Sequence, residues 1–510
     1  MLKHLTTITL GLCLTVPASP VTVQCEEKPY IINHYDLTIK PDFVAKTLSV
    51  EGTIVIDNPE LRPDFSFGLN DRFTSVELTS PSSSVTVERG GGWCTATLTT
   101  PGKTVTLHFS LKGAPGASND VGREVIADST LFLLWSDRFY PIDFDHWSTV
   151  TTTILLPRNF KTIAPGLLKQ TRKTDRGIEY RFETSRPTVC FSVFADSRWI
   201  STERTINGIR MQTLLYPESQ RFAGQIFGTS SEILAFYSAT YSPFPFDQFA
   251  FVSISGLDAR RAFDGFIGYE PRYLERELNT TGHDAHETAL LWWCYTLRGS
   301  GKGAFQWTEG FGDYAEILYG EKYHKPIPAI FARFRSEYLK LSAEQDLLYG
   351  DLKGNTPQNM IHGKYPWLMH VLRFVVGDTA FQRGMKLLFE RFSFRTFTME
   401  EYIAALEEGC GQSLTWWRDE WLNRRGVPEI AFASAVEREG NHYRVTCTID
   451  QKGGLYHLPL EIGIATASGM NLEKVRMSEK HTARTFTSEQ KPTGIVLDPN
   501  GWILMKKTTE

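Results

Sequence analysis

The sequence has few cysteines, no long apolar run and no excess of one charge. Its 7 cysteines in 510 residues form no C-x-x-C pairs, which argues against a cysteine-ligated metal site. The longest apolar stretch, Leu5 to Val16, has about twelve residues, whereas a helix that spans a bilayer needs about 20. Lys and Arg number 54 against 58 Asp and Glu, a net charge of -4 without long runs of one sign. We therefore expect no nucleic-acid partner.

The first residues have the pattern of a secretory signal peptide. Lys3 precedes the apolar stretch, and small residues follow it at Pro17-Ala18-Ser19. We expect a signal peptide over residues 1–22, no further membrane anchor, and export to the periplasm or the extracellular space. Export permits disulfides, but the spacing of the remaining cysteines does not assign pairs.

Apolar periodicity divides the mature chain into three segments. From about residue 30 to 195, short runs of alternating apolar and polar residues are separated by turn clusters, which predicts antiparallel strands. Between about 205 and 428 the period becomes helical. After Gly426-Val427-Pro428 the alternation returns, and about 80 residues fit a small β-sandwich. The predicted helices and strands of the last two segments are Ser230–Tyr241, His286–Leu297, Glu309–Tyr319, Tyr365–Val376, Thr379–Phe392, Met399–Glu408, Tyr443–Ile449, Leu458–Ile464 and Gly494–Leu497.

The helical segment contains most of a zinc peptidase motif. His286 and Glu287 begin an H-E-x-x-H pattern, and Glu309 follows residue 290 after eighteen residues. In that pattern two histidines on one helical face bind zinc, and the glutamate activates the metal-bound water. Leu290 occupies the second histidine's position. His286 and Glu309 therefore leave zinc with two protein ligands, whereas catalytic sites use three and a water.

The whole mature chain resembles the aminopeptidase N family of zinc metallopeptidases, the gluzincins. Matching segments occur in the family's order: Asn33–Leu37, Tyr140-Pro141, Tyr241–Asp247, His286–Trp293, Lys364–Arg373 and Trp421–Pro428. The resemblance implies a multidomain α+β fold with a β-saddle domain over 23–203, a thermolysin-like, mainly helical catalytic-type domain over 204–428 and a β-sandwich over 429–510. It also implies zinc as a cofactor, which the ligand count puts in doubt.

The resemblance assigns roles around the motif. It makes His286 and Glu309 zinc ligands and Glu287 the general base, which is vestigial if the metal is lost. His283 is a candidate substitute for the missing ligand in a rearranged site. Alternatively, His283 is only a polar residue in the first helical turn. It lies one turn before Glu287 and shares the helical face of Glu287, not that of His286.

Two further departures affect catalysis and substrate binding. His362 stands where the family has the tyrosine that stabilises the oxyanion; it either keeps a donor role when protonated or is structural. In the loop that holds the substrate's amino group, Ala262 replaces the family's glutamate. Arg260 and Arg261 would make this edge positive and favour a carboxylate or acidic chain; the alternative is a solvated surface pair.

The three departures lead us to expect a secreted, non-catalytic homologue that binds a peptide or protein. The sequence leaves open whether the chain is an enzyme, and the alternative is an active zinc metallopeptidase with a reorganised site. A third reading, metal-independent hydrolysis by Glu287 and His286, has no nucleophile elbow or organised triad to support it.

Overall fold

A computed structural model shows how the chain folds over most of its length. It describes residues 28–117, 124–257, 260–279, 283–300, 304–323, 327–348, 351 and 356–508; within these, the side chains of 276, 277, 279, 283, 284, 304–307 and 328 are left out. The expected signal peptide, residues 1–22, lies outside the described residues.

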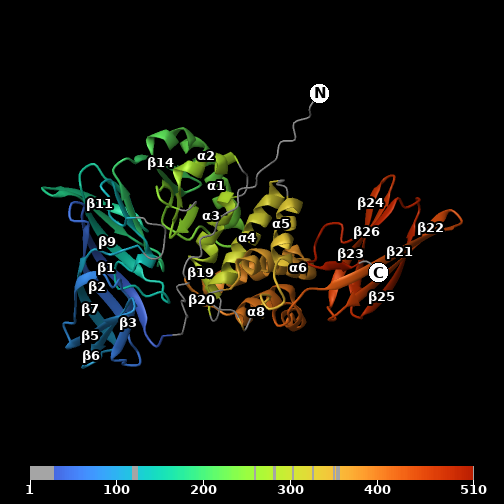
Figure 1. Cartoon of the computed structure of the whole chain (residues 1–510), viewed down its shortest axis with the longest axis horizontal. Helices are drawn as coiled ribbons and strands as arrows, with labels where there is room; N and C mark the ends of the chain where they lie inside the picture. The colour runs from blue at the N-terminus through green and yellow to red at the C-terminus, as the bar shows by residue number, and fades with distance from the viewer. Residues whose placement is uncertain are drawn as a thin grey trace.

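The fold has three parts arranged in a row along its longest axis (Figure 1). Strands coloured blue to cyan lie at one end, helices and strands coloured green to orange in the middle, and red strands at the other end. Strands account for 41% and helices for 28%, which is consistent with the expected multidomain α+β class. The division into a saddle, a thermolysin-like domain and a sandwich at the expected boundaries stays a prediction.

The described residues of the N-terminal part form three sheets. In β7 every second residue from Val105 to Leu111 is buried, as the alternating sequence predicts. The seven-stranded sheet has the order β11 (Leu167–Thr174), β12 (Gly177–Glu183), β9 (Thr149–Leu156), β1 (Ile31–Asp42), β2 (Thr47–Asp57), β7 (Thr104–Gly113), β4 (Phe73–Thr79). The others are β3 (Asp64–Gly68), β6 (Trp93–Leu98), β5 (Val85–Gly90), and β10 (Lys161–Ile163), β13 (Val193–Asp196), β8 (Thr130–Leu133).

The middle part begins with a five-stranded sheet that apolar periodicity alone does not reveal. Its order is β14 (Ile200–Ile206), β15 (Ile209–Leu215), β16 (Phe249–Ser253), β18 (Phe266–Tyr269), β17 (Arg260–Phe263). All five residues of β16 are buried, so this strand lacks the alternation that identifies a half-exposed strand. Residue 203, the expected end of the first domain, lies inside β14.

Helices form the rest of the middle part. They are α1 (Ala223–Thr240), α2 (Pro271–Asn279), α3 (His283–Trp293), α4 (Ala304–Lys322), α5 (Ile327–Leu339), α6 (Tyr365–Val376), α7 (Asp378–Phe392), α8 (Met399–Cys410) and the short α9 (Thr415–Trp417). A π-helical turn over Met360–Lys364 leads into α6, and another follows α9 over Arg418–Leu422. β19 (Leu297–Gly299) pairs with β20 (Arg395–Phe397) beside α3 and α7. α3 packs against α4, which places the motif residues of both helices together.

The C-terminal part has two sheets whose core is continuous with that of the helices. One cluster of buried apolar residues extends from Trp147 to Met505 and includes the helices and both C-terminal sheets. Most of the N-terminal part has a second cluster, and a third joins β8, β10 and β13 to the five-stranded sheet. The sheets have the orders β25 (His481–Ser488), β22 (His442–Lys452), β21 (Glu429–Glu439), β27 (Lys506–Thr508), and β24 (Gly469–Met477), β23 (Leu458–Thr466), β26 (Gly494–Leu497).

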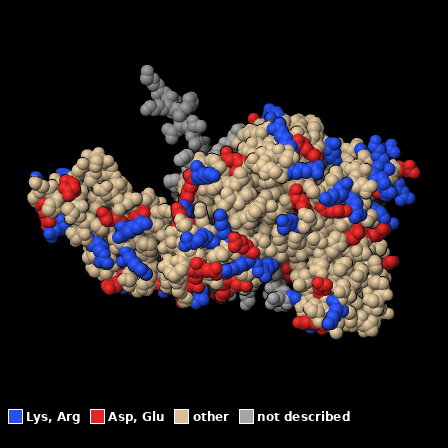
Figure 2. Space-filling view, turned by 180° about the vertical axis from the view of Figure 1, so that it is seen from behind, with Lys and Arg blue, Asp and Glu red and all other residues tan. Residues whose placement is uncertain are grey.

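The surface carries charges of both signs. On the face shown in Figure 2, acidic and basic side chains are interspersed over most of the molecule, with a denser basic group at the right edge. None of the helices formed by the described residues has the length and apolar character of a membrane-spanning segment.

Candidate functional site

His286 and Glu309 meet where α3 packs against α4. Nε2 of His286 lies 3.1 Å from Oε1 of Glu309, although 23 residues separate them in the sequence. His286 is 7% exposed. The structure therefore brings together the two residues that sequence reasoning assigned as metal ligands, at a separation that two ligands of one ion can have.

Leu290 fills the position of the missing ligand. It lies one turn after His286 on α3 and is buried. Its Cδ2 is only 2.7 Å from where a Cβ on Gly312 would lie, so the absence of a side chain at Gly312 makes room for the leucine. The side chain of His283, the candidate substitute, lies outside the described residues. The described residues do not fit the three-ligand set that the resemblance implies for zinc.

Asp313 connects the two histidines of the site. Its Oδ1 lies 3.2 Å from Nδ1 of His286, and its Oδ2 lies 2.7 Å from Nδ1 of His362. His362 extends from the π-helical turn before α6, and its Nε2 is 3.1 Å from Oε1 of Gln358. His362 thus reaches the cluster around His286, although the spacing from the H-E motif does not show it.

These contacts favour charged side chains in a buried place. Burial by itself would lower the pKa of His286, but Asp313 and Glu309 raise it well above its usual value. Burial also opposes protonation of His362, but Asp313 favours it, and the pKa of His362 is raised. Burial would raise the pKa of Asp313, yet the two histidines hold it well below its usual value. An imidazolium has a proton on both nitrogens and must lose one before it can bind a metal.

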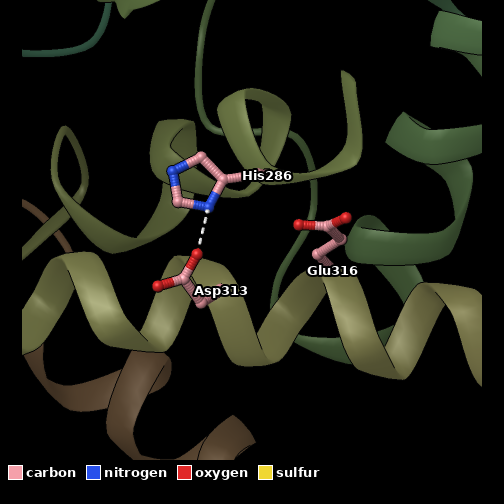
Figure 3. A group of neighbouring side chains, drawn as sticks. All are labelled: His286, Asp313 and Glu316. Carbon is pink, nitrogen blue, oxygen red and sulfur yellow. Dashed lines mark ion pairs between the residues drawn. The ribbon is translucent and has the colours of Figure 1, made fainter. Parts of the chain in front are cut away.

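Glu316 adds another carboxylate, one turn after Asp313 on α4. Atoms of His286, Asp313 and Glu316 that could bind a metal all lie within 4.8 Å of one another, and all three residues are buried. Figure 3 shows both carboxylates rising from α4 toward the imidazole. Burial raises the pKa of Glu316. Sequence reasoning missed Asp313 and Glu316, although their spacing of four and seven residues from Glu309 places all three on one helical face.

Glu287 is held by the edge strand of the five-stranded sheet. Nε of Arg260 lies 3.3 Å from its Oε1, and the backbone N–H of Ala262 donates to its Oε2 at 2.9 Å. The carbonyl of Ala262 accepts a hydrogen bond of 2.5 Å from the hydroxyl of Tyr295, just after α3. Arg261, the next residue in β17, is likewise partly buried. The structure thus joins Arg260 to Glu287, a pair that sequence reasoning had assigned to different tasks.

Comparisons with known proteins relate part of the chain to aminopeptidase N. No protein-family model matches the chain. A segment of 116 residues, 21% of the chain, is 26% identical to aminopeptidase N of Haemophilus influenzae and covers 13% of that protein. A segment of 111 residues, 20% of the chain, is 32% identical to aminopeptidase N of Lactococcus lactis subsp. lactis and covers 12% of it. These low-identity, partial matches support an aminopeptidase N-like relationship.

Proposed function

We propose that this chain is a non-catalytic relative of aminopeptidase N that binds a peptide or a protein partner. The observation that carries the proposal is the position of Glu287, the residue at the general base's place. One of its oxygens pairs with Arg260 and the other accepts the N–H of Ala262. A general base has to accept a proton from a water within hydrogen-bond reach. Here a water would first have to displace contacts that the protein itself supplies.

The metal-binding side of the cleft supports the same proposal. Zinc-dependent hydrolysis requires three ligands and an open position for water. Leu290 contributes no lone pair and is packed against Gly312. His362, at the position of the oxyanion donor, is directed to Asp313 and Gln358. Metal retention and transition-state stabilisation are therefore both altered in this chain.

The partner we propose is an acidic peptide or an acidic protein segment. Arg260 and Arg261 lie next to each other on β17, the last strand of the sheet order. A guanidinium group binds a carboxylate with charge-assisted hydrogen bonds, often in pairs. An acidic side chain or a terminal carboxylate can compete with Glu287 for Arg260. Such a partner would meet the chain after export, in the periplasm or outside the cell.

A second candidate function is zinc-dependent peptide hydrolysis at a reorganised site. It is favoured by the 3.1 Å separation of His286 and Glu309 and by the carboxylate of Asp313 beside the other ring nitrogen. Metal-binding histidines commonly have such a carboxylate at their second nitrogen. In this case Glu287 would have to leave Arg260 to act on water.

The first experiment compares zinc content with hydrolysis for the purified mature chain. We expect no turnover of a mixed peptide substrate by mass spectrometry, with or without added zinc. Turnover that a chelator removes and zinc restores would refute the non-catalytic proposal and favour the second candidate.

The second experiment tests the acidic partner. We expect an Asp- and Glu-rich peptide to bind more tightly than its Asn and Gln counterpart, and Arg260→Ala to weaken that binding by about tenfold or more. Arg272→Ala is the matched control, because Arg272 is exposed, pairs with Glu270 and lies outside β17. Equal losses in both variants, or equal binding of the two peptides, would contradict the proposal.

A further inference from the structure

Three carboxylates on α4 lie near the imidazole of His286. Glu309, Asp313 and Glu316 follow one another at intervals of four and three residues, so they share one face of the helix. His286 lies between them: its Nε2 faces Glu309 and its Nδ1 faces Asp313. His362 is the second imidazole in this cluster and contacts Asp313 alone among the three carboxylates. The cluster thus has more carboxylates than imidazoles in a largely buried place.

Two polar groups of the cluster lack a hydrogen bond. Glu316 is 7% exposed, yet among the described residues it accepts no hydrogen bond and forms no ion pair. Arg260 and Arg333 act on it only over a longer distance. Nδ1 of His286 is 3.2 Å from Asp313, but the two groups are not aligned for a hydrogen bond. Burying polar groups without a hydrogen bond is costly, and a bound cation would give both of them a direct contact.

We propose that Nδ1 of His286 and carboxylate oxygens of Asp313 and Glu316 bind a divalent cation of the first transition row. Their atoms already lie within 4.8 Å of one another, so a small contraction brings all three to bonding distance (Figure 3). An imidazole with two carboxylates suits Zn²⁺ or Mn²⁺, with waters completing the coordination. This site shares His286 with the one implied by the resemblance, but it uses Asp313 and Glu316 of α4 in place of Glu309 and the motif's second histidine.

The cation would fasten α3 to α4 without restoring hydrolysis. His286 belongs to α3, whereas Asp313 and Glu316 belong to α4. Glu287 points to Arg260 and Ala262 instead. The metal site and the non-catalytic proposal are therefore separate, and each can fail without the other.

The experiment compares Glu316→Gln with Glu309→Gln, two changes of the same kind on the same helix. Each purified chain is stripped with chelator, dialysed, titrated with Zn²⁺ and Mn²⁺ separately, and assayed for metal per chain and for thermal unfolding. We expect about one ion per wild-type chain and a higher unfolding temperature with metal. Glu316→Gln should weaken binding by about 100-fold or more, because loss of a group that only supports a ligand already costs about 10- to 100-fold. Glu309→Gln should weaken it by less than tenfold.

Three results would overturn this proposal. In the first, the wild-type chain binds neither ion, and metal does not change its unfolding temperature. Glu316 would then be protonated instead of metal-bound. Another is a larger loss of binding in Glu309→Gln than in Glu316→Gln, which would place the ion at Nε2. The third is unchanged binding in Glu316→Gln. Circular dichroism of each metal-free variant checks its fold, and the wild-type titration decides the question if a variant does not fold.

Discussion

Two buried histidines in the middle part have opposite surroundings. His286, between α3 and α4, faces carboxylates through both ring nitrogens. His370, on α6, lies between the rings of Phe331 and Trp502, with centroids 4.1 Å and 4.4 Å away. The carboxylates raise the pKa of His286 well above its usual value, whereas burial and Arg373 lower that of His370 well below it.

The surroundings of His286 therefore favour a charged imidazole, whereas those of His370 favour a neutral one. Trp502 comes from the C-terminal part and stacks on both His370 and Phe374 of α6. In this contact the neutral imidazole of His370 packs against the indole as an aromatic ring does in a hydrophobic core. The carboxylate cluster instead depends on balancing charges. Substitutions in the two regions should therefore change different quantities.

The largest expected effect is at the aromatic junction. Trp502→Ala removes the ring that stacks on His370 and Phe374, and we expect it to lower the free energy of unfolding by about 2–4 kcal/mol. Denaturant titration measures the change. Trp93→Ala is the control, because Trp93 is 41% exposed and should cost about 1 kcal/mol or less. A loss at Trp502 no greater than that of the control would mean that the junction contributes little.

The next effect concerns metal affinity in the charged region. Leu290→His places an imidazole one turn after His286, while Glu309 already lies 3.1 Å from that histidine. We expect zinc affinity to rise by about 100-fold over the parent chain, a change of about 2.7 kcal/mol. Competition with a chromophoric chelator measures it. Leu290→Val should not raise the affinity; equal affinities in the two variants would show that the helices do not present three ligands to one ion.

A smaller effect is expected for the ion pair at Glu287. Arg260→Gln and Glu287→Gln should each lower the free energy of unfolding by about 1–3 kcal/mol, because the side chains are only 19% and 11% exposed and each change removes a charge that attracts the other. The double variant should lose less than the sum of the two, with a coupling of about 1–2 kcal/mol. Additive losses would show that the two charges do not stabilise each other.

The last expected effect is a pH dependence at Asp264, a buried carboxylate that has no imidazole partner among the described residues. Burial raises its pKa to about 7 against the hydrogen bonds from the N–H groups of Val189 and Cys190. The folded chain therefore binds this proton more tightly than the unfolded chain, so stability falls as pH rises from about 4 to about 7, by at most about 1.4 kcal/mol per pH unit.

Asp264→Asn should remove this contribution while keeping an oxygen acceptor. Free energies of unfolding of both chains at about pH 5 and about pH 7.5 measure it, and the variant should lose less stability between them. Equal slopes in the two chains would show that Asp264 keeps an ordinary pKa in the fold.

Some elements of the fold could be predicted from their apolar residues and from the turn residues that bound them. The predicted helix Tyr365–Val376 and the predicted strand Gly494–Leu497 have the bounds of α6 and β26. The strand β16 could not be identified in the same way, because its residues are all buried and its sequence has no alternation. Burial on both faces depends on which helices cover a sheet, and this is a tertiary property.

The site was only partly predictable for a similar reason. His286 and Glu309 could be assigned from a motif whose spacing is fixed by helix geometry, and their spatial proximity agrees with it. The pairing of Arg260 with Glu287 joins residues 27 positions apart, from a strand and a helix, which no local spacing encodes. Asp313 and Glu316 follow a helical spacing from Glu309, but they lie beyond the motif, which ends at Phe311, so the motif does not identify them.

The hydrogen bonds at Ala262 have a further consequence for the solubility of the chain. An unoccupied strand edge offers N–H and C=O groups to which a strand of another molecule can pair, and proteins that leave such edges open are prone to aggregate. Glu287 and Tyr295 cover one donor and one acceptor on the outer edge of β17. Glu287 would then protect the sheet edge from pairing with another strand, and replacing it with an apolar residue would promote self-association.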